Sequence, residues 1–180
     1  MNYYARIDSP LGPITMAGDG NALTGLWFDG QRYDRAGMAP DARNVPLPLF
    51  RETAEWLAGY FAQNPPVQLP PLAPRGTDFQ RRVWRALGEL PWGTVCTYGE
   101  LAARLGIPRA ARAVGAAVGR NPISLLIPCH RVLGTGGALT GYAGGLERKA
   151  WLLRHEGILP DLPEDRRTSG AVSIAFSPEL

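Results

Sequence analysis

The chain is poor in cysteine and has no long apolar run. Only two of its 180 residues are cysteines, Cys96 and Cys129, which are too few for the disulfide framework of a small secreted domain. No apolar stretch approaches the length of a membrane span, and no basic and apolar leader precedes a small-residue cleavage site. These absences predict a cytoplasmic protein with no membrane partner. The length allows one large or two small domains.

The net charge is small, but the positive charge is concentrated. Residues 77–160 hold eleven basic and five acidic groups, a net charge of +6, whereas residues 1–76 carry −1 and residues 161–180 carry −2. Eighteen of the nineteen basic residues are arginine, whose planar guanidinium can bind a phosphate with two hydrogen bonds. Basic charge confined to one segment is typical of a surface that binds a polyanion, so the pattern favours a nucleic acid partner. Solvated helix faces are the alternative explanation.

The first 63 residues predict a small α/β domain. Residues 3–29 alternate apolar and polar side chains around turn signals at residues 9–12 and 18–21, which indicates a short antiparallel sheet. Residues 48–63 carry apolar side chains at helical spacing. Residues 64–76 contain five prolines, which remove backbone donors and fix φ, so this segment is expected to be the linker to a second domain.

Two helical patterns with a short turn between them predict a helix-turn-helix. The first covers residues 98–105, and the second is expected to begin with Pro108 and to run to about Gly119. The second helix presents small residues that permit close approach to a duplex, and it carries Arg109 and Arg112. An alanine-rich packing helix is the alternative interpretation.

The helix-turn-helix belongs to a second domain expected over residues 77–160. Its other elements, in chain order, are a helix over residues 78–89 capped by Thr77, a glycine-rich hairpin or wing over residues 134–145, and a helix over residues 146–156 ended by Gly157. Residues 161–180 are expected to form a loosely ordered tail.

One short run, Ile127-Pro128-Cys129-His130-Arg131, combines a potential nucleophile, a base and a cation. A neighbouring base or cation raises the thiolate fraction of a cysteine, and the thiolate is the reactive form. Adjacent side chains diverge, so His130 is expected to reach the sulfur through an ordered water or a bend at Pro128. A third group must then orient the histidine. The alternative is that Cys129 is a small buried apolar residue.

A zinc site is a further alternative, because Cys96, Cys129, His130 and His155 number four. Their spacing matches no usual ligand pattern, and two of them are adjacent. We therefore expect no metal and no cofactor.

Several motifs between about Phe79 and Gly157 resemble those of the O6-alkylguanine-DNA alkyltransferases, in that family's order and at its spacing. These motifs are Ile127-Pro128-Cys129-His130-Arg131-Val132, Gly93-Thr94-Val95-Cys96-Thr97-Tyr98-Gly99-Glu100-Leu101-Ala102, Ala110-Ala111-Arg112-Ala113-Val114-Gly115, Gly119-Arg120-Asn121-Pro122, Gly141-Tyr142-Ala143-Gly144-Gly145 and Leu152-Leu153-Arg154-His155-Glu156-Gly157. The resemblance implies a ribonuclease-H-like α/β domain, a small antiparallel sheet plus a helix, followed by a mostly α winged helix-turn-helix domain.

The resemblance also implies a reaction. In such proteins the cysteine takes the alkyl group from O6 of a guanine in alkylated double-stranded DNA, and a monomer reacts once because the thioether product is stable. Matched residue by residue, Cys129 is the acceptor, His130 its water-linked base and Glu156 the carboxylate that orients the imidazole. Asn121 would brace the turn beneath the cysteine.

The matched motifs imply a DNA-binding role for the second helix of the helix-turn-helix. The target atom lies inside the duplex, so the base must be swung out into a pocket. Arg112 would fill the gap that the base leaves, while Ala111, Ala113 and Gly115 approach the minor groove. Tyr98 would donate a hydrogen bond to guanine N3.

The remaining pocket residues come from the two loops near Cys129. Backbone groups around Cys129 and Val132, together with Tyr142, would recognise the rest of the base. Two positions depart from the family pattern: Ala143 stands where many relatives have a serine whose hydroxyl would contact O6, and Ser124 stands where some relatives have a proline that would form an apolar wall. The second change bears on the acceptance of bulky benzyl groups.

Two other functions compete with this one. A winged helix protein, including the family's alkyltransferase-like members, could bind DNA without chemistry, but such members lack the acceptor that Cys129 provides. A thiol hydrolase could be built on Cys129, His130 and Glu156. Turnover of an ester would support the hydrolase, whereas a single burst equal to the protein concentration would contradict it.

Overall fold

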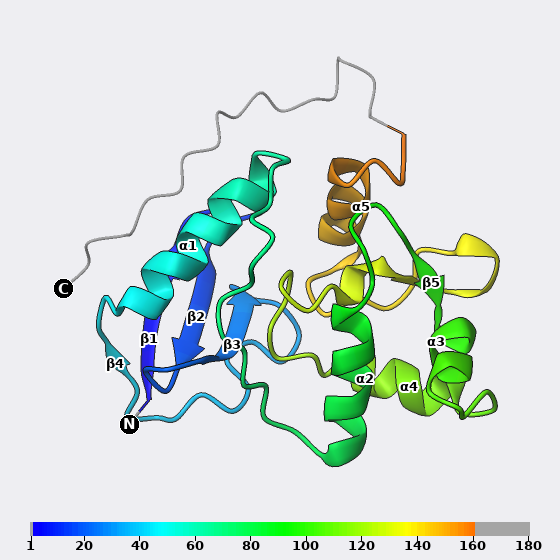
Figure 1. The fold of residues 1–180 in the computed structure, drawn as a ribbon, viewed down its shortest axis with the longest axis horizontal. Coiled ribbons are helices and arrows are strands. Elements are labelled where there is room, and N and C mark those ends of the chain that lie inside the picture. Colours follow the sequence, from blue (N-terminus) through cyan, green and yellow to red (C-terminus); the bar gives the residue numbers. More distant parts are fainter. Residues whose placement is uncertain (1, 161–180) are drawn as a thin grey trace.

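The computed structural model describes residues 2–160, which form two lobes (Figure 1). In the first lobe, β1 (Tyr3–Ile7), β2 (Ile14–Gly18) and β3 (Leu23–Phe28) form an antiparallel sheet, as the alternation predicts. A short fourth strand, β4 (Arg43–Asn44), pairs with β1 in the parallel direction. The expectation of a purely antiparallel sheet was therefore wrong. A two-residue strand is too short to leave an alternating pattern in the sequence.

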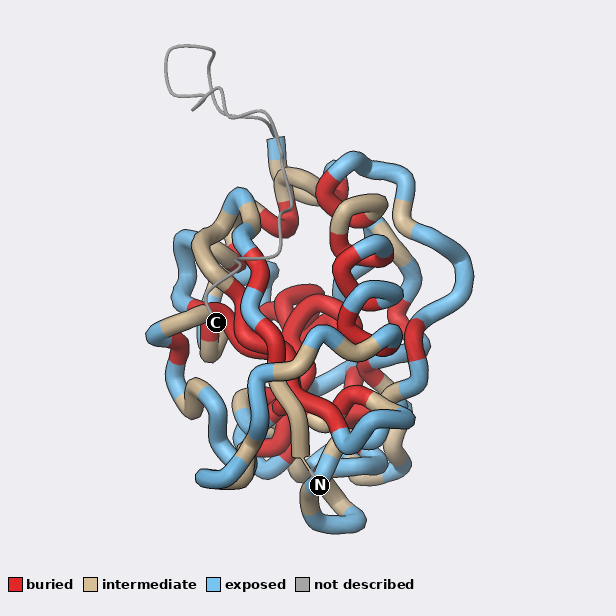
Figure 2. Tube along the Cα trace, turned by 90° about the vertical axis from the view of Figure 1, so that its left-hand side faces the viewer, coloured by how far each residue is buried: buried red, intermediate tan, exposed pale blue. Residues whose placement is uncertain are grey.

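One helix covers one face of this sheet. The helix α1 (Pro48–Phe61) has proline in its first turn, where the missing backbone donor costs nothing. Its buried side chains, among them Phe50 and Leu57, pack on the buried side chains of the strands, such as Ile7 and Ile14. Buried residues of both lobes belong to one apolar cluster, and the buried stretches lie toward the middle of the molecule (Figure 2).

The proline-rich residues after α1 run along the edge of the sheet. The backbone N–H of Leu23 donates to the carbonyl of Pro71 (2.8 Å), and the N–H of Ala73 donates to the carbonyl of Leu23 (2.7 Å). These two bonds cover part of the exposed edge of β3, which would otherwise offer unpaired backbone groups.

The second lobe begins with three helices. The helices are α2 (Asp78–Gly88), α3 (Tyr98–Arg104) and α4 (Ala111–Val118). Thr77 caps α2 as predicted, with a reciprocal bond to Gln80. The helix expected to begin at Pro108 begins at Ala111 instead. Residues 107–110 form a turn closed by a hydrogen bond from Ala110 N to Ile107 O (2.9 Å), so the proline lies in that turn and not in the helix.

The rest of the second lobe surrounds a short 3₁₀ turn, η1 (Cys129–Arg131). The strand β6 (Val132–Leu133) follows it and pairs in parallel with β5 (Cys96–Thr97). The hairpin expected at residues 134–145 is absent from these described residues: they form a loop containing the 3₁₀ turn η2 (Thr135–Gly137). Four of its glycines, Gly136, Gly137, Gly141 and Gly145, have positive φ, a backbone conformation that does not occur within a regular strand.

The last helix, α5 (Leu146–His155), ends as predicted. Glu156 is its C-cap residue, and Gly157 follows with φ of 75°, the left-handed conformation that ends many helices. The tail expected at residues 161–180 lies outside the described residues. Within residues 2–160, no helix is long and apolar enough to cross a membrane.

Two lobes share one interface near the cysteine turn. The N–H of Leu26 in β3 donates to Pro122 O (2.8 Å), and the N–H of Ser124 donates to Leu26 O (2.9 Å). Residues 121–130 are all buried. The segment that carries the cysteine is therefore held between the sheet lobe and the helical lobe.

Candidate active site

Asn121 holds the turn that presents Cys129. Its side-chain amide donates to Ile127 O (2.8 Å) and lies 3.1 Å from Cys129 Sγ, while its oxygen accepts from Ile123 N (3.0 Å). All of these groups are buried. One side chain thus fixes both ends of the loop before the cysteine and donates to the sulfur itself.

His130 and Glu156 form a buried pair beside this turn. His130 Nε2 lies 2.7 Å from Glu156 Oε1, and both side chains are fully buried. Burial by itself raises the pKa of Glu156, but hydrogen bonds from His130 and Arg131 outweigh it and lower the pKa to about 2. Glu156 is therefore a carboxylate, so Nε2 must carry the proton that it donates.

The other imidazole nitrogen is left with a lone pair. Burial lowers the pKa of His130, which keeps the ring neutral near pH 7. Its Nδ1 is buried and makes no hydrogen bond to any residue of the described chain. The ring of Tyr142 stands edge-on to the imidazole, with centroids 6.4 Å apart. This histidine can accept a proton at Nδ1 while Glu156 stabilises the resulting positive charge.

Glu156 has two further partners that the sequence did not single out. Arg131 binds the carboxylate with two hydrogen bonds, Nε to Oε2 (2.7 Å) and Nη2 to Oε1 (2.9 Å), and its Nη1 donates to Leu90 O (2.6 Å). Tyr60 of α1 donates from its hydroxyl to Oε1 (2.8 Å). Tyr60 follows Leu57 at helical spacing on the buried side of α1, and that register was the available signal.

The only lysine of the sequence, Lys149, is also buried at the site. Its Nζ donates to Val132 O (2.5 Å) and Thr140 O (2.7 Å), so it ties the strand after the cysteine turn to the loop before α5. Burial lowers the pKa of Lys149 to about 8. The sequence analysis missed this residue, although Lys149 shares the core-facing side of α5 with Leu152 and Leu153.

Cys129 is a buried thiol near one positive charge, that of Lys149, and several hydrogen-bond donors. Burial raises the pKa of Cys129, and the amide of Asn121, the charge of Lys149 and nearby backbone N–H groups oppose that rise. The resting sulfur is therefore protonated, and a thiolate forms only when a base removes the proton. This geometry agrees with both interpretations of Cys129 in the sequence analysis. The thiol is buried among apolar residues, and it also has the neighbours that a nucleophile needs.

A pocket of about 450 Å³ is lined by Tyr142, whose ring lies edge-on to that of His130, but by no residue of the cysteine turn itself. Its lining residues are Arg32, Tyr33, Tyr98, Gly115, Ala116, Gly119, Arg120, Gly141, Tyr142 and Ala143. Tyr98 donates from its hydroxyl to Gly141 O (3.1 Å), which joins the start of α3 to the loop before α5. Burial and the charge that a Cys129 thiolate would carry raise the pKa of both Tyr98 and Tyr142, so both hydroxyls stay protonated.

Two of the residues expected in the pocket lie behind its wall. Val132 is fully buried, and Ser124 is 1% exposed, with its hydroxyl 3.3 Å from Gln31 Oε1. Gln31 also accepts from Phe28 N (3.0 Å). Gln31 of the first lobe therefore contacts Ser124 of the segment before the cysteine, a contact between distant residues that has no local sequence signal.

The expected DNA-binding residues gather on α4 and the turn before it. Arg112 and Ala113 are exposed on α4, and Ala111 and Gly115 are half-buried. Arg109 is also exposed but precedes the helix. A Cβ atom on Gly115 would lie 3.5 Å from the Tyr98 ring, so α4 packs closely against that pocket residue.

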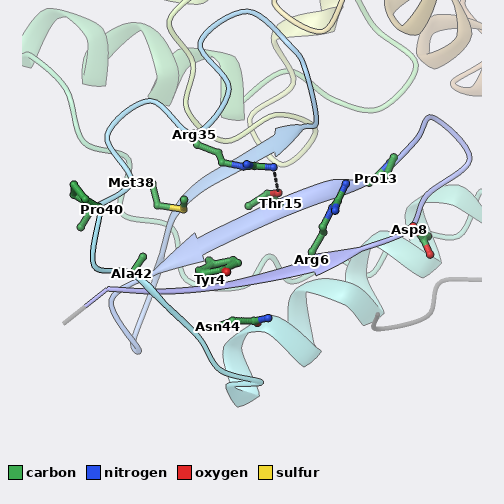
Figure 3. Close-up of a pocket in the computed structure, with 11 residues that line it drawn as sticks. Tyr4, Arg6, Asp8, Pro13, Thr15, Arg35, Met38, Pro40, Ala42 and Asn44 are labelled. Atoms are coloured by element: carbon green, nitrogen blue, oxygen red, sulfur yellow. Dashed lines mark hydrogen bonds between the residues drawn. The ribbon is translucent and has the colours of Figure 1, made fainter. Parts of the chain in front are cut away.

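A second hollow, of about 860 Å³, lies on the face of the sheet away from α1 (Figure 3). Tyr4 and Arg6 of β1 point into it, because alternate residues of a strand face opposite sides. Its arginines are engaged: Arg6 and Arg35 both pair with Asp29. No cysteine or histidine lines it, and no group of residues suited to hold a metal ion occurs within residues 2–160. The chemistry-bearing residues are at the cysteine turn.

Comparison with known proteins gives the family. A family model described as "6-O-methylguanine DNA methyltransferase, DNA binding domain" matches residues 78–158, and one described as "6-O-methylguanine DNA methyltransferase, ribonuclease-like domain" matches residues 2–71. The chain belongs to the 6-O-methylguanine DNA methyltransferase family. The resemblance read from the motifs is thereby confirmed and extends to the first lobe.

Members of this family match over most of the chain. Proteins named methylated-DNA–protein-cysteine methyltransferase are 62% identical in Salmonella typhimurium, over 86% of this chain and 95% of that protein, and 47% identical in Mycobacterium tuberculosis, over 87% and 93%. A crystal structure of Mycobacterium tuberculosis OGT in complex with DNA has a TM-score of 0.77 at 45% identity, covering 86% of this chain and 92% of that chain. An O6-methylguanine-DNA methyltransferase from Pyrococcus kodakaraensis has a TM-score of 0.64 at 27% identity, over 87% and 99%.

Proposed function

We propose that the protein repairs alkylated double-stranded DNA by moving the alkyl group from O6 of guanine to Cys129, once per molecule. The observation that carries this proposal is the buried arrangement of Asn121, Cys129, His130 and Glu156. It joins a thiol, a neutral base and an orienting carboxylate, as nucleophilic catalysis requires. The names of the relatives and the DNA in the related crystal structure support the same reaction.

In the proposed reaction, His130 Nδ1 takes the proton from Cys129 through a bridging water. The thiolate then attacks the alkyl carbon in line with the carbon–oxygen bond, a carbon–sulfur bond forms, and the electron pair of the broken bond stays on O6. Glu156 stabilises the imidazolium of His130 during this step. The thiol proton ends on the guanine, so the products are repaired guanine and a neutral thioether.

Tyr98 is proposed to act as the acid toward the guanine ring. Its raised pKa keeps the hydroxyl protonated and able to donate. It would exchange its bond to Gly141 O for one to guanine N3, which helps the purine accept the electron pair. Tyr142 and Ala143 would hold the base from the opposite wall, with Val132 and Ser124 supporting that wall from behind.

DNA is proposed to bind across α4. The exposed Arg112 would enter the stack and occupy the space of the extruded base, which offsets a cost of about a few kcal/mol in lost stacking and pairing. Ala111, Ala113 and Gly115 would face the minor groove, and Arg109 would reach a phosphate from the turn before the helix. In this proposal the second lobe is a winged helix-turn-helix with residues 134–145 as the wing, and the first lobe is ribonuclease-H-like. The protein works as a cytoplasmic monomer without a cofactor.

The deciding experiment is intact mass measurement after incubation with duplex DNA that contains O6-methylguanine. The proposal expects one added methylene mass, located on the peptide that contains Cys129, in an amount equal to the active protein. A hydrolase using Cys129, His130 and Glu156 would instead turn over an ester repeatedly and keep its original mass. A protein that only binds DNA would show neither result.

A further inference from the structure

Glu156 receives a hydrogen bond from the other lobe. The hydroxyl of Tyr60, on α1 of the sheet lobe, donates to Glu156 Oε1 at 2.8 Å, although the two residues are 96 positions apart in the sequence. The same oxygen accepts the proton of His130 Nε2 at 2.7 Å. Tyr60 and His130 thus share one carboxylate oxygen, and the sheet lobe contacts the machinery that activates the cysteine.

The position of this hydroxyl is tightly fixed. Tyr60 is fully buried, and its ring packs on Trp56 with centroids 5.6 Å apart and edge-on to Trp92 at 5.0 Å. His155 Nε2 donates to the backbone oxygen of Tyr60 (2.8 Å), and Gln63 donates to the backbone oxygen of His155 (3.1 Å). The end of α1 is therefore clamped to the end of α5, directly beside Glu156.

We propose that Tyr60 is a positioning residue for alkyl transfer. Its hydroxyl holds Glu156 Oε1 toward His130 and, by donating to the same oxygen, reduces the negative charge that acts on the imidazole. This inference rests on the proposed function. A phenylalanine would fill the same space in the aromatic cluster, so packing alone does not require the hydroxyl. The hydroxyl matters because it is a donor aimed at the oxygen that the base also uses.

The sign of the effect follows from the shared oxygen. The groups that face the pair of Glu156 and His130 are Tyr60 from α1, Cys129 and Arg131 from η1, Tyr142 from the loop before α5, and Lys149 from α5. Removing the Tyr60 hydroxyl leaves Oε1 with one donor fewer, so more of its negative charge acts on His130. A carboxylate with more charge stabilises the imidazolium, and the pKa of His130 rises.

The first test is an NMR titration of the imidazole signals in the full chain. The sequence contains only two histidines, which simplifies assignment of the His130 signals. In Tyr60→Phe the pKa of His130 is expected to rise by about half a unit or more. Gln63→Ala is the matched control, because it removes a bond between the same two helices without touching Glu156. An unshifted His130 in a folded Tyr60→Phe protein overturns the proposal.

A second substitution, expected to shift the pKa of His130 in the opposite direction, provides a test if the Tyr60→Phe protein does not fold. Replacing Tyr60 by 3,5-difluorotyrosine keeps the ring and makes the hydroxyl a stronger donor, so the pKa of His130 is expected to fall. A shift in the same direction as that of Tyr60→Phe, or no shift, contradicts the shared-oxygen argument.

The second test is the pH dependence of the single-turnover rate with methylated duplex. A base with a raised pKa is protonated over more of the acidic range, so Tyr60→Phe should lose rate near pH 6, by at most about threefold for a half-unit rise, and little near pH 8.5. Uniform slowing at both pH values, with a normal His130 titration, would mean a purely structural role. If the wild-type protein transfers no alkyl group, the proposed function fails, whatever the NMR titration shows.

Discussion

The amide nitrogen of Asn121 lies 3.1 Å from Cys129 Sγ and 2.8 Å from Ile127 O. The same side chain therefore determines the shape of the loop and the surroundings of the sulfur. A buried amide that donates to sulfur also stabilises a thiolate when one forms, because the donor is already in place. Stability and reactivity are coupled at this residue.

Asn121→Ala should lower both properties. The substitution leaves the carbonyl of Ile127 and the N–H of Ile123 without their buried partner, so the free energy of unfolding is expected to fall by about 1–3 kcal/mol. The single-turnover rate should fall further than stability explains, because the thiolate loses a donor. Denaturant unfolding and rapid-quench kinetics measure the two effects. Asn121→Asp keeps the shape but replaces the donor by an acidic group beside the sulfur, so it should slow the reaction at least as much as Asn121→Ala, and a normal rate in that variant would contradict the role of the amide.

Glu156 makes the protein sensitive to acid. Its pKa is about 2 in the folded protein against 4.5 in its ordinary environment. Because the folded value is the lower one, the carboxylate stabilises the fold above pH 4.5, and this contribution of about 3 kcal/mol is lost as the pH falls from 4.5 toward 2. In Glu156→Gln this acid-dependent loss should be absent, although the variant is less stable at pH 7 because Arg131 keeps no partner for its charge. If the free energy of unfolding fell equally with pH in the wild type and in Glu156→Gln, Glu156 would not be the cause of the acid sensitivity.

The sequence predicted the elements whose signals are local. The capping residue Thr77, the end of α5 at Gly157 and the alternation in β1 to β3 each depend on neighbouring residues, and the structure has all three. The strand β4 and the true start of α4 at Ala111 were not predicted. A two-residue strand exists only because β1 is beside it, and the turn at residues 107–110 competes with a helix start that the residue types also allow.

In the candidate site, too, the residues with a local sequence signal were predicted, and those that act through distant contacts were not. Cys129 and His130 are adjacent in the sequence, and Glu156 was reached only through the resemblance to a family. Tyr60 and Lys149 were missed as participants, and Arg131 was expected to act as a cation beside Cys129 and not as a partner of Glu156, because these roles depend on contacts between distant segments. A charged or hydroxyl-bearing residue on the core-facing side of a helix is a sequence signal, but it does not name the partner that the residue meets.

Cys129→Ala should abolish alkyl transfer and leave DNA binding intact, because the sulfur is the proposed acceptor and the proposed DNA contacts lie on α4. Intact mass after incubation with methylated duplex measures the first effect, and a gel-shift or anisotropy titration measures the second. Cys96→Ala is the matched control. Cys96 is also buried, and burial raises its pKa, but among the described residues no histidine or other proton-accepting side chain is hydrogen-bonded to it. Transfer that survives in Cys129→Ala and disappears in Cys96→Ala would reassign the acceptor.

Arg112→Ala tests base extrusion. The exposed guanidinium is proposed to fill the stack after the base leaves, so its loss should slow repair of methylated duplex by about ten- to a hundredfold, the equivalent of a few kcal/mol in the cost of flipping. Reaction with the free base O6-methylguanine needs no extrusion and should be nearly unchanged. Equal slowing on both substrates would contradict the role of Arg112.

Arg109→Ala is the control for charge in this last experiment, because Arg109 is exposed in the turn before α4 and is proposed to contact only phosphate. It should weaken binding to any duplex and reduce the steepness of the salt dependence by about one counterion, since each phosphate contact releases roughly one bound cation. Its rate at saturating DNA should stay near that of the wild type. A saturating rate as low as that of Arg112→Ala would mean that both arginines act through charge, and that neither enters the stack.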